Sequence, residues 1–555
     1  MNQPGGDPAD ADQEADQSGP IDSEQIIERD RSRPQPRHHK RSRPEHIYVF
    51  PPFALVEGEK AVEAVDGASR GHHRRHHYRR RDRGREPYHQ SSSGRQLRQR
   101  SETSLQRSHL ESHSLKPGGG AFLRPSVSDA VGKEGQTDYH SQKQHGTVEG
   151  CHLIDVIGPQ AFSLGSLLTL AECRIADEAD PLGDRRAFFD LPPDLIYLDG
   201  NSLGPPTQSV RGGVEQVLSD WRGRLIAGWW ESGWVDLPRI VGARLEPIVG
   251  AEPGSVVCSD STSVNLFKAV TAMCGRSSGD ILTDVGNFPS CLYILESIAR
   301  QHRRRLRVVD PDEVLPNIDS DVGVVSLTQV DFRSGRLHNM EEITRRAGAL
   351  GAMTVWDLSH SAGVIPIELA RWEVDAAVGC GYKYLNGGPG APAYIYISPR
   401  HSDEVANPIN GWFSHRSPFD FSTEFVPAEG IDRMRTGTPD IISMAGLNEA
   451  LKAYEAIGVE QVWKKSVALT TLFIDLIDRE VGCEVLTPRE PQQRGSQVSL
   501  RIPQAEKLMS MLSNEGVIGD FRPPDVARFG FSPLYIRYQD VWRATAAIKS
   551  ILARI

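Results

Sequence analysis

The sequence has few cysteines and lacks any long apolar run. Its 7 Cys among 555 residues are scattered without a CxxC pair, so neither a disulfide framework nor a Cys-based metal site is indicated. No stretch of 18 apolar residues occurs, and we therefore predict no membrane-spanning helix. The acidic start of the chain lacks the apolar segment of a secretory signal peptide. We expect a protein that works in the reducing cytoplasm, away from membranes.

Tryptophan is absent from the first part of the chain. All 9 Trp and 7 of the 8 Met lie after residue 160. Residues 1–160 are rich in Arg, His, Ser, Gln and Gly, with too few large apolar side chains to offset the entropy of ordering. We predict a disordered Arg/His-rich extension over 1–160. Its 11 Arg between Arg70 and Arg100 are typical of an arm for nucleic acid or of a solvated tail.

The part of the chain after residue 150 has no excess of positive charge. Residues 151–555 carry 39 basic and 51 acidic side chains, a net charge of −12. An acidic globular region argues against nucleic acid as the main partner.

The part after residue 164 alternates short apolar runs with helical patterns. Strands are expected at 195–199, 255–258, 280–283, 306–309, 322–327, 354–357 and 376–380. Helices are expected at 210–224, 263–273, 291–302, 340–350 and 441–457, the first of them capped by Thr207. This order predicts an α/β fold with a mostly parallel sheet in a large domain over 164–440. A smaller α+β C-terminal domain is expected over 441–555, with the N-terminal segment of the large domain contributing to it.

Two expected strands end in polar groups that suit one cofactor. Asp357 ends the apolar run 352–356, and Lys383 follows the run 374–380. Ligands of open α/β sheets bind at the carboxyl ends of the strands. A Lys and an Asp placed there suit pyridoxal phosphate (PLP), since the amine can form a Schiff base and the carboxylate can hold the pyridinium N–H. The alternative is a surface Lys and a helix-capping Asp.

Three other features are compatible with such a site. Thr262 and Ser263 lie at an expected helix start, where phosphate binds well, although they could equally be an ordinary N-cap. Phe288 could stack on a cofactor ring or simply fill the core. Arg528 could hold a substrate carboxylate or make a surface ion pair.

Taken together, several motifs resemble the kynureninase family. They are YLDGNSLG at 197–204, DLSH at 357–360, GYKYLNGGPG at 381–390, GWF at 411–413 and RTGTP at 435–439. The resemblance covers roughly residues 164–555 in collinear order. It implies a fold-type I PLP enzyme of the class V aminotransferase group that works as a homodimer with shared active sites. The implied reaction is hydrolysis of L-kynurenine, or of 3-hydroxy-L-kynurenine, to anthranilate or 3-hydroxyanthranilate and L-alanine, in tryptophan catabolism towards NAD biosynthesis.

The same resemblance implies a role for each matching position. Lys383 is expected to hold PLP and to be catalytic, with Tyr382 as an acid–base relay. The further cofactor contacts are expected to be Thr262, Ser263, Phe288, Thr328, Asp357, His360, Tyr382, Trp412 and Thr438, with Trp412 and Thr438 reaching the partner subunit's cofactor. The expected substrate contacts are Ser202, Trp230 and Arg528, and no metal is expected.

One position departs from the family pattern. The family has Asp after Asn-Phe-Pro-Ser/Thr, whereas this chain has Cys291. Loss of a negative charge near the cofactor would weaken its electron-sink character, so reduced rather than absent activity is expected.

Two alternatives remain at this point. A cysteine desulfurase-like lyase of the same fold would need a nucleophilic Cys on a mobile loop, and neither Cys291 nor Cys380 fits well. A non-catalytic scaffold acting through the 70–100 arm would lack the visible absorbance of the cofactor.

Overall fold

The computed structural model describes residues 169–555. The extension predicted over 1–160, including the arginine-rich segment, lies outside the described residues.

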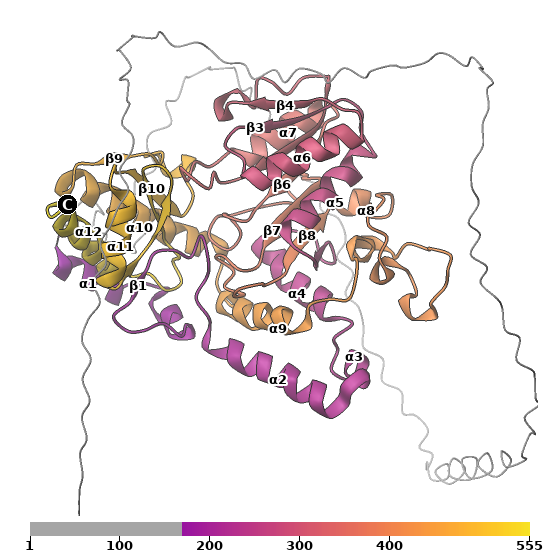
Figure 1. Cartoon of the computed structure of the whole chain (residues 1–555), viewed down its shortest axis with the longest axis horizontal. Helices are drawn as coiled ribbons and strands as arrows, with labels where there is room; N and C mark the ends of the chain where they lie inside the picture. The colour runs from indigo at the N-terminus through magenta and orange to yellow at the C-terminus, as the bar shows by residue number, and fades with distance from the viewer. Residues whose placement is uncertain (1–168) are drawn as a thin grey trace, which may run out of the picture. The chain divides into compact units, whose positions relative to one another are not determined.

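A seven-stranded sheet forms the centre of the larger part of the structure (Figure 1). In spatial order its strands are β2 (Val256–Cys258), β8 (Ala393–Ile397), β7 (Ala376–Cys380), β6 (Met353–Asp357), β5 (Val322–Thr328), β3 (Asp280–Asp284) and β4 (Leu306–Val309). The pairs from β7 to β4 are parallel, while β8 runs antiparallel to both β7 and β2. The sequence analysis predicted no strand at β8. Because β8 is antiparallel to both of its neighbours, the sheet is mixed at one edge.

Both faces of this sheet are buried, because successive side chains of each strand alternate between two apolar clusters. Val324 and Val355 belong to one cluster, which α5 (Thr262–Cys274) and α6 (Pro289–Gln301) cover. Val325 and Trp356 belong to the other, which α4 (Leu237–Leu245) and α7 (Met340–Ala349) cover. Near-continuous apolar strands such as β5 and β7 are therefore required by the fold.

A second, four-stranded antiparallel sheet lies nearer the C-terminus. Its order is β12 (Asp520–Arg522), β13 (Val526–Gly530), β10 (Gln497–Arg501) and β9 (Glu484–Val485). Helices α10 (Val459–Glu480), α11 (Ala505–Asn514) and α12 (Tyr538–Leu552) pack with it, and α1 (Leu170–Glu178) packs on α12 (Figure 1). A short parallel pair joins β1 (Ile196–Tyr197) to β11 (Val517–Ile518), so an N-terminal segment completes this region.

The remaining elements connect these two regions. They include α2 (Gln208–Arg224), which packs on α9 (Ile441–Ala450), and the short helices α3 (Gly228–Glu231) and α8 (Pro399–Ser402). The 3-10 helices span 183–188, 225–227, 246–248, 311–313, 412–414, 418–420, 430–434, 451–454 and 491–493.

Two local expectations differ from the structure. The helix expected over 441–457 ends at Ala450 and continues only as a 3-10 turn, because Glu455 is extended and Ala456 adopts a positive φ of 62°. Thr207 does occupy the N-cap position of α2, but its hydroxyl lies 3.3 Å from Oγ of Ser209 instead of bonding the helix backbone.

Candidate active site

A cavity of about 160 Å³ lies at the carboxyl ends of three neighbouring parallel strands. Thr328 ends β5, Asp357 ends β6, and Lys383 follows β7 by three residues. The cavity is lined by Thr262, Ser263, Leu266, Phe288, Ser290, Cys291, Thr328, Phe332, Asp357, Ser359, His360, Tyr382 and Lys383. Eight of the side chains expected at the cofactor therefore lie together, at the edge of the sheet where open α/β folds bind ligands.

The amine of Lys383 is paired with a histidine rather than a carboxylate. Nζ of Lys383 lies 2.9 Å from Nε2 of His360. Burial lowers the pKa of His360 well below its usual value, and the positive charges of Lys383 and Arg528 lower this pKa further. A neutral imidazole can accept a hydrogen bond at Nε2 from the amine, in which case Nδ1 carries the ring proton. That Nδ1 is buried and has no hydrogen-bond partner among residues 169–555.

Asp357 supplies a buried carboxylate in the same cavity. Its Oδ1 accepts the backbone N–H of Ser359 at 2.8 Å, and the Sγ of Cys291 lies 3.8 Å from its Oδ2. Burial raises the pKa of the Cys291 thiol, and the charge of Asp357 raises it further, so the thiol stays protonated and donates. Since neither neighbour is a cation, the charge of Asp357 remains available to a cationic partner such as a pyridinium.

The start of α5 forms one end of the cavity. Thr262 and Ser263 are the first two residues of this 13-residue helix, and Ser261 caps it through its hydroxyl. Free backbone N–H groups and hydroxyls at a helix N-terminus favour a phosphate.

The loop before α5 is fixed by a buried ion pair. Asp260 has a positive φ of 53°, and its carboxylate binds Nζ of Lys268 at 2.7 Å and Oγ1 of Thr436 at 2.5 Å. Burial alone would raise the pKa of Asp260, but the charge and hydrogen bond of Lys268 lower it overall. The loop is thereby held without leaving a free negative charge beside the phosphate end.

Aromatic side chains border the cavity. Phe288 contacts Phe332 edge to face, with ring centroids 5.0 Å apart, and remains 42% exposed. The ring of Tyr382 lies 5.7 Å from Nζ of Lys383. Burial raises the pKa of Tyr382, so its hydroxyl keeps its proton at neutral pH. The cavity thus combines an amine, a carboxylate, a helix N-terminus and an exposed aromatic ring, which are the kinds of group that bind PLP.

Five expected site residues do not line this cavity. Ser202 and Arg528 lie together in a buried polar cluster, and Arg528 donates to the backbone carbonyl of the cavity residue Phe332. Trp230 and Trp412 both pack on Phe419, with ring centroids 5.1 and 5.5 Å from it. Thr438 lines a separate apolar cavity.

Several residues that shape the site carried no clear sequence signal. Ser290 and Ser359 line the cavity, while Asp520 and Arg522 surround Arg528. The alternation of Asp520 and Arg522 along a short strand was the one available hint, because it places both side chains on one face.

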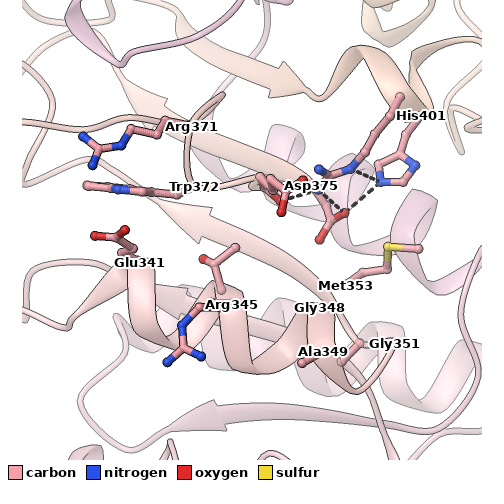
Figure 2. Close-up of a pocket in the computed structure, with 14 residues that line it drawn as sticks. Glu341, Arg345, Gly348, Ala349, Gly351, Met353, Arg371, Trp372, Asp375 and His401 are labelled. Atoms are coloured by element: carbon pink, nitrogen blue, oxygen red, sulfur yellow. Dashed lines mark hydrogen bonds and ion pairs between the residues drawn. The ribbon is translucent and has the colours of Figure 1, made fainter. Parts of the chain in front are cut away.

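A larger cavity of about 410 Å³ lies at the opposite, amino-terminal edge of the same sheet. Figure 2 shows the Trp372 ring between the side chains of Arg371 and Glu341, with Asp375 bonded to His401. Asp375 also accepts bonds from Arg400 and from both the backbone and the hydroxyl of Thr354, so this buried carboxylate is already satisfied. We assign the active site to the smaller cavity, which contains the amine and the accessible carboxylate.

Other kinds of site are not indicated in the described part of the chain. No group of three metal-ligating side chains occurs within residues 169–555, and no helix there is long and apolar enough to cross a membrane.

The fold is that of a PLP-dependent transferase of fold type I. The chain matches an apo cysteine desulfurase from Thermococcus onnurineus NA1 with a TM-score of 0.59 at 19% identity, over 67% of this chain and 98% of that one. A cystine lyase mutant, C-DES, with glycine linked to its PLP cofactor matches with a TM-score of 0.58 at 16% identity, over 66% and 98%. These matches confirm the expected fold class and carry no further argument about function.

Sequence relatives identify the family. The chain is 43% identical over 397 residues to a kynureninase from Deinococcus radiodurans, covering 69% of this chain and 97% of that protein. It is 40% identical over 401 residues to a kynureninase from Pseudomonas fluorescens, covering 70% and 96%. Residues 462–548 match the family model described as the kynureninase C-terminal domain. The chain belongs to the kynureninase family, as its motifs predicted, and the desulfurase and scaffold alternatives are not favoured.

Proposed function

We propose that this chain hydrolyses L-kynurenine to anthranilate and L-alanine at the cavity around Lys383, with PLP as its cofactor. The observation that carries the proposal is the pairing of the Lys383 amine with a neutral His360 in a cavity that also contains Asp357, in a member of the kynureninase family. We extend the proposal to 3-hydroxy-L-kynurenine, which would give 3-hydroxyanthranilate.

Each cavity residue has a proposed part in holding the cofactor. Lys383 would attach it covalently, and Asp357 would face the ring nitrogen. Thr262 and Ser263 at the start of α5, together with Tyr382, would bind the phosphate, and Phe288 would stack on the ring. Thr328 and His360 would complete the contacts. When bound, PLP supplies the electron sink that allows bonds at the substrate's α-carbon to be broken.

The proton transfers are assigned to Lys383 and its neighbours. Nζ of Lys383 takes the proton from the substrate's α-carbon, and the neutral His360 next to it orients this nitrogen by accepting a hydrogen bond at Nε2. Tyr382, which keeps its proton at neutral pH, is positioned as a donor beside Lys383. Water adds to the γ-carbonyl carbon and the Cβ–Cγ bond breaks, which releases anthranilate. A proton delivered to Cβ and a proton returned to Cα then give L-alanine.

Ser202, Trp230 and Arg528 are proposed to bind the substrate. Arg528 is the cation for the α-carboxylate, and its bond to the Phe332 carbonyl places it at the border of the cavity. Trp230 is 59% exposed and packs on Phe419, so it would reach an aryl group only at an assembled site.

We propose that the active unit is a homodimer. A large apolar cavity of about 1040 Å³ includes Thr438, Trp221 and the segment 386–390, which is the second half of the motif that contains Lys383. Exposed apolar side chains surround it, among them Trp221 at 56% and Ile442 at 44% exposure. Exposed apolar side chains that line a groove together favour a protein partner on this face. A second copy on this face would let Trp412 and Thr438 approach the partner's cofactor.

The division of the chain and its location are proposed in the same way. A large domain over 164–440 and a small domain over 441–555 agree with the two sheets and with a family match confined to 462–548. The six cysteines of the described region are all free thiols, which supports a reducing cytoplasmic setting.

The test combines two optical measurements on the purified full-length chain supplied with PLP. A visible absorption band from the bound cofactor, followed by anthranilate fluorescence on adding L-kynurenine, is the expected result. A band without anthranilate would reject the proposed reaction and retain the fold.

Light scattering tests the proposed homodimer. It should give the mass of a dimer, and a fully active monomer would reject the shared active site.

A further inference from the structure

The guanidinium of Arg528 is enclosed by partners from this chain. Its Nε donates to Oδ1 of Asp520 at 2.8 Å, and its Nη2 donates to Oδ2 of Asp520 and to Oγ of Ser202. Its Nη1 donates to the carbonyl of Phe332, and the side chain is only 1% exposed. These contacts use four of the five N–H groups of an arginine. A substrate carboxylate therefore cannot form a two-bond fork with Arg528 unless a present partner leaves.

Asp520 already makes the fork that a substrate carboxylate would make. Both of its oxygens bind one edge of Arg528, which is the preferred geometry of a carboxylate on a guanidinium. The same Oδ2 also accepts Nη2 of Arg522 at 2.7 Å and the hydroxyl of Ser202 at 2.8 Å. Asp520 is thus one carboxylate shared between two arginines.

Arg522 differs from Arg528 because it has N–H groups that make no hydrogen bond within the described residues. Arg522 has a 37% exposed side chain, and its Nε is buried without a hydrogen-bond partner among residues 169–555. Its contact with Ser202 is long, at 3.5 Å. If Asp520 left Arg528, the free Nε of Arg522 could bind the released carboxylate oxygen, so that no buried charge would be stranded.

This cluster adjoins the cofactor cavity. Phe332 lines the cavity with its side chain and binds Arg528 with its carbonyl. The charges of Arg528 and Arg522 both contribute to the lowered pKa of His360, after burial and the charge of Lys383. A ligand whose α-carbon lies beside Lys383 would have its carboxylate within reach of the cluster.

We propose that Asp520 is an internal competitor for the substrate's α-carboxylate, and that Arg522 takes over Asp520 when the substrate binds. The inference rests on the proposed function, in which Arg528 binds that carboxylate. The exchange replaces one carboxylate by another on Arg528 and moves no proton. Because a ligand without a carboxylate could not displace Asp520, the exchange also selects carboxylate-bearing amino acids.

Kinetics of three variants test the exchange. Asp520→Asn keeps the shape but removes the competing charge, so KM for L-kynurenine should fall about fivefold while kcat changes less than twofold. Arg522→Gln removes the residue that receives Asp520, so KM should rise about fivefold. In the Asp520→Asn background, Arg522→Gln should have no further effect. Arg501→Gln, in the neighbouring strand β10 on an exposed pair with Glu484, is the matched control and should leave KM unchanged.

A binding measurement separates this inference from the proposed reaction. In calorimetric titrations of the PLP-loaded protein, Asp520→Asn should tighten binding of L-alanine and leave binding of L-alaninamide, which lacks the carboxylate, unchanged. If Asp520→Asn does not fold, as judged by its circular dichroism melt, Asp520→Ser is tested in the same way.

Two results would overturn the proposal. A raised KM and weaker L-alanine binding in Asp520→Asn would make Asp520 a support for Arg528 only. An equal effect of Arg522→Gln in both backgrounds would mean that Arg522 does not act through Asp520. Absence of anthranilate from the unaltered protein would reject the proposed function instead, and the L-alanine titration would still decide the exchange.

Discussion

Nζ of Lys268 lies 2.7 Å from Oδ2 of Asp260, and this pair fixes the loop that leads into α5 at one end of the cavity. Lys268 is fully buried and also donates to the backbone carbonyl of Met434. The pair connects the start of α5 with the segment around Thr436, so its influence extends beyond its own helix.

Lys268→Met should lower the free energy of unfolding by about 3 kcal/mol, because it leaves Asp260 as a largely buried charge without its cation. It should also weaken PLP binding, since the loop before Thr262 loses its anchor. Chemical denaturation and a PLP titration measure the two effects. Lys549→Met, in an exposed pair with Glu480, should have little effect on the free energy of unfolding. If Lys268→Met cost no more than this control, the pair would not stabilise the loop.

Lys383→Ala should abolish the visible absorption band of the attached cofactor and reduce turnover by about a thousandfold or more, because both covalent attachment and proton transfer are lost. Absorbance and anthranilate fluorescence are the measurements. Lys549→Ala on the exposed surface should change neither signal. Retained activity in Lys383→Ala would contradict its assignment.

Cys291→Asp should raise turnover severalfold, because a second negative charge near Asp357 would favour the protonated cofactor ring. In the cofactor-free protein the same change places two carboxylates side by side, so its melting temperature should fall. Cys291→Ser retains a neutral donor to Asp357 and serves as the control. An unchanged or lower rate in Cys291→Asp would mean that the site has adapted to a thiol.

Asp199 gives a pH-dependent test of stability. Burial, together with the charge of Asp520, raises the pKa of Asp199 to about 6, and its Oδ1 has no partner in the described region. The folded state therefore binds this proton more tightly than the unfolded state, whose pKa is 3.8. Stability is lost as the pH rises from 3.8 to about 6, by roughly 3 kcal/mol in total.

Asp199→Asn cannot ionise, so it should be more stable than the unaltered protein by about 2 to 3 kcal/mol at pH 7.5 and equally stable near pH 4. Urea denaturation of the full chain at the two pH values provides the comparison. Asp184→Asn, on a 73% exposed side chain, should show no such difference. A stability gain that is the same at both pH values would exclude ionisation as its cause.

Local sequence patterns predicted that Asp357, Lys383 and Thr262 would lie at one edge of the sheet. Apolar runs ending at Asp357 and preceding Lys383 predicted buried parallel strands, and such strands deliver their following residues to one edge of the sheet. The helix start at Thr262 was visible for the same local reason. In contrast, β8 was missed although it pairs with both β7 and β2, because the sequence analysis assigned no element to this short apolar run.

The substrate side depended on contacts that no local pattern reveals. Arg528 was expected to be free for a carboxylate, whereas its partners Ser202 and Phe332 lie 326 and 196 residues away in the chain. Trp230 and Trp412 were assigned separately, yet both pack on Phe419, which carried no signal of its own. Pairings of this kind arise from tertiary packing and are not encoded in spacing.

The two sides of the site also differ in where they lie along the chain. All the residues that line the cofactor cavity fall between positions 262 and 383, whereas the cluster around Arg528 joins Ser202 to residues 520–528. During synthesis on the ribosome, every residue of the cofactor cavity therefore emerges well before the C-terminal strands that hold Asp520 and Arg528. A nascent chain can therefore contain every residue of this cavity while it still lacks Asp520 and Arg528, so the chain gains its proposed means of recognising an amino acid late in synthesis.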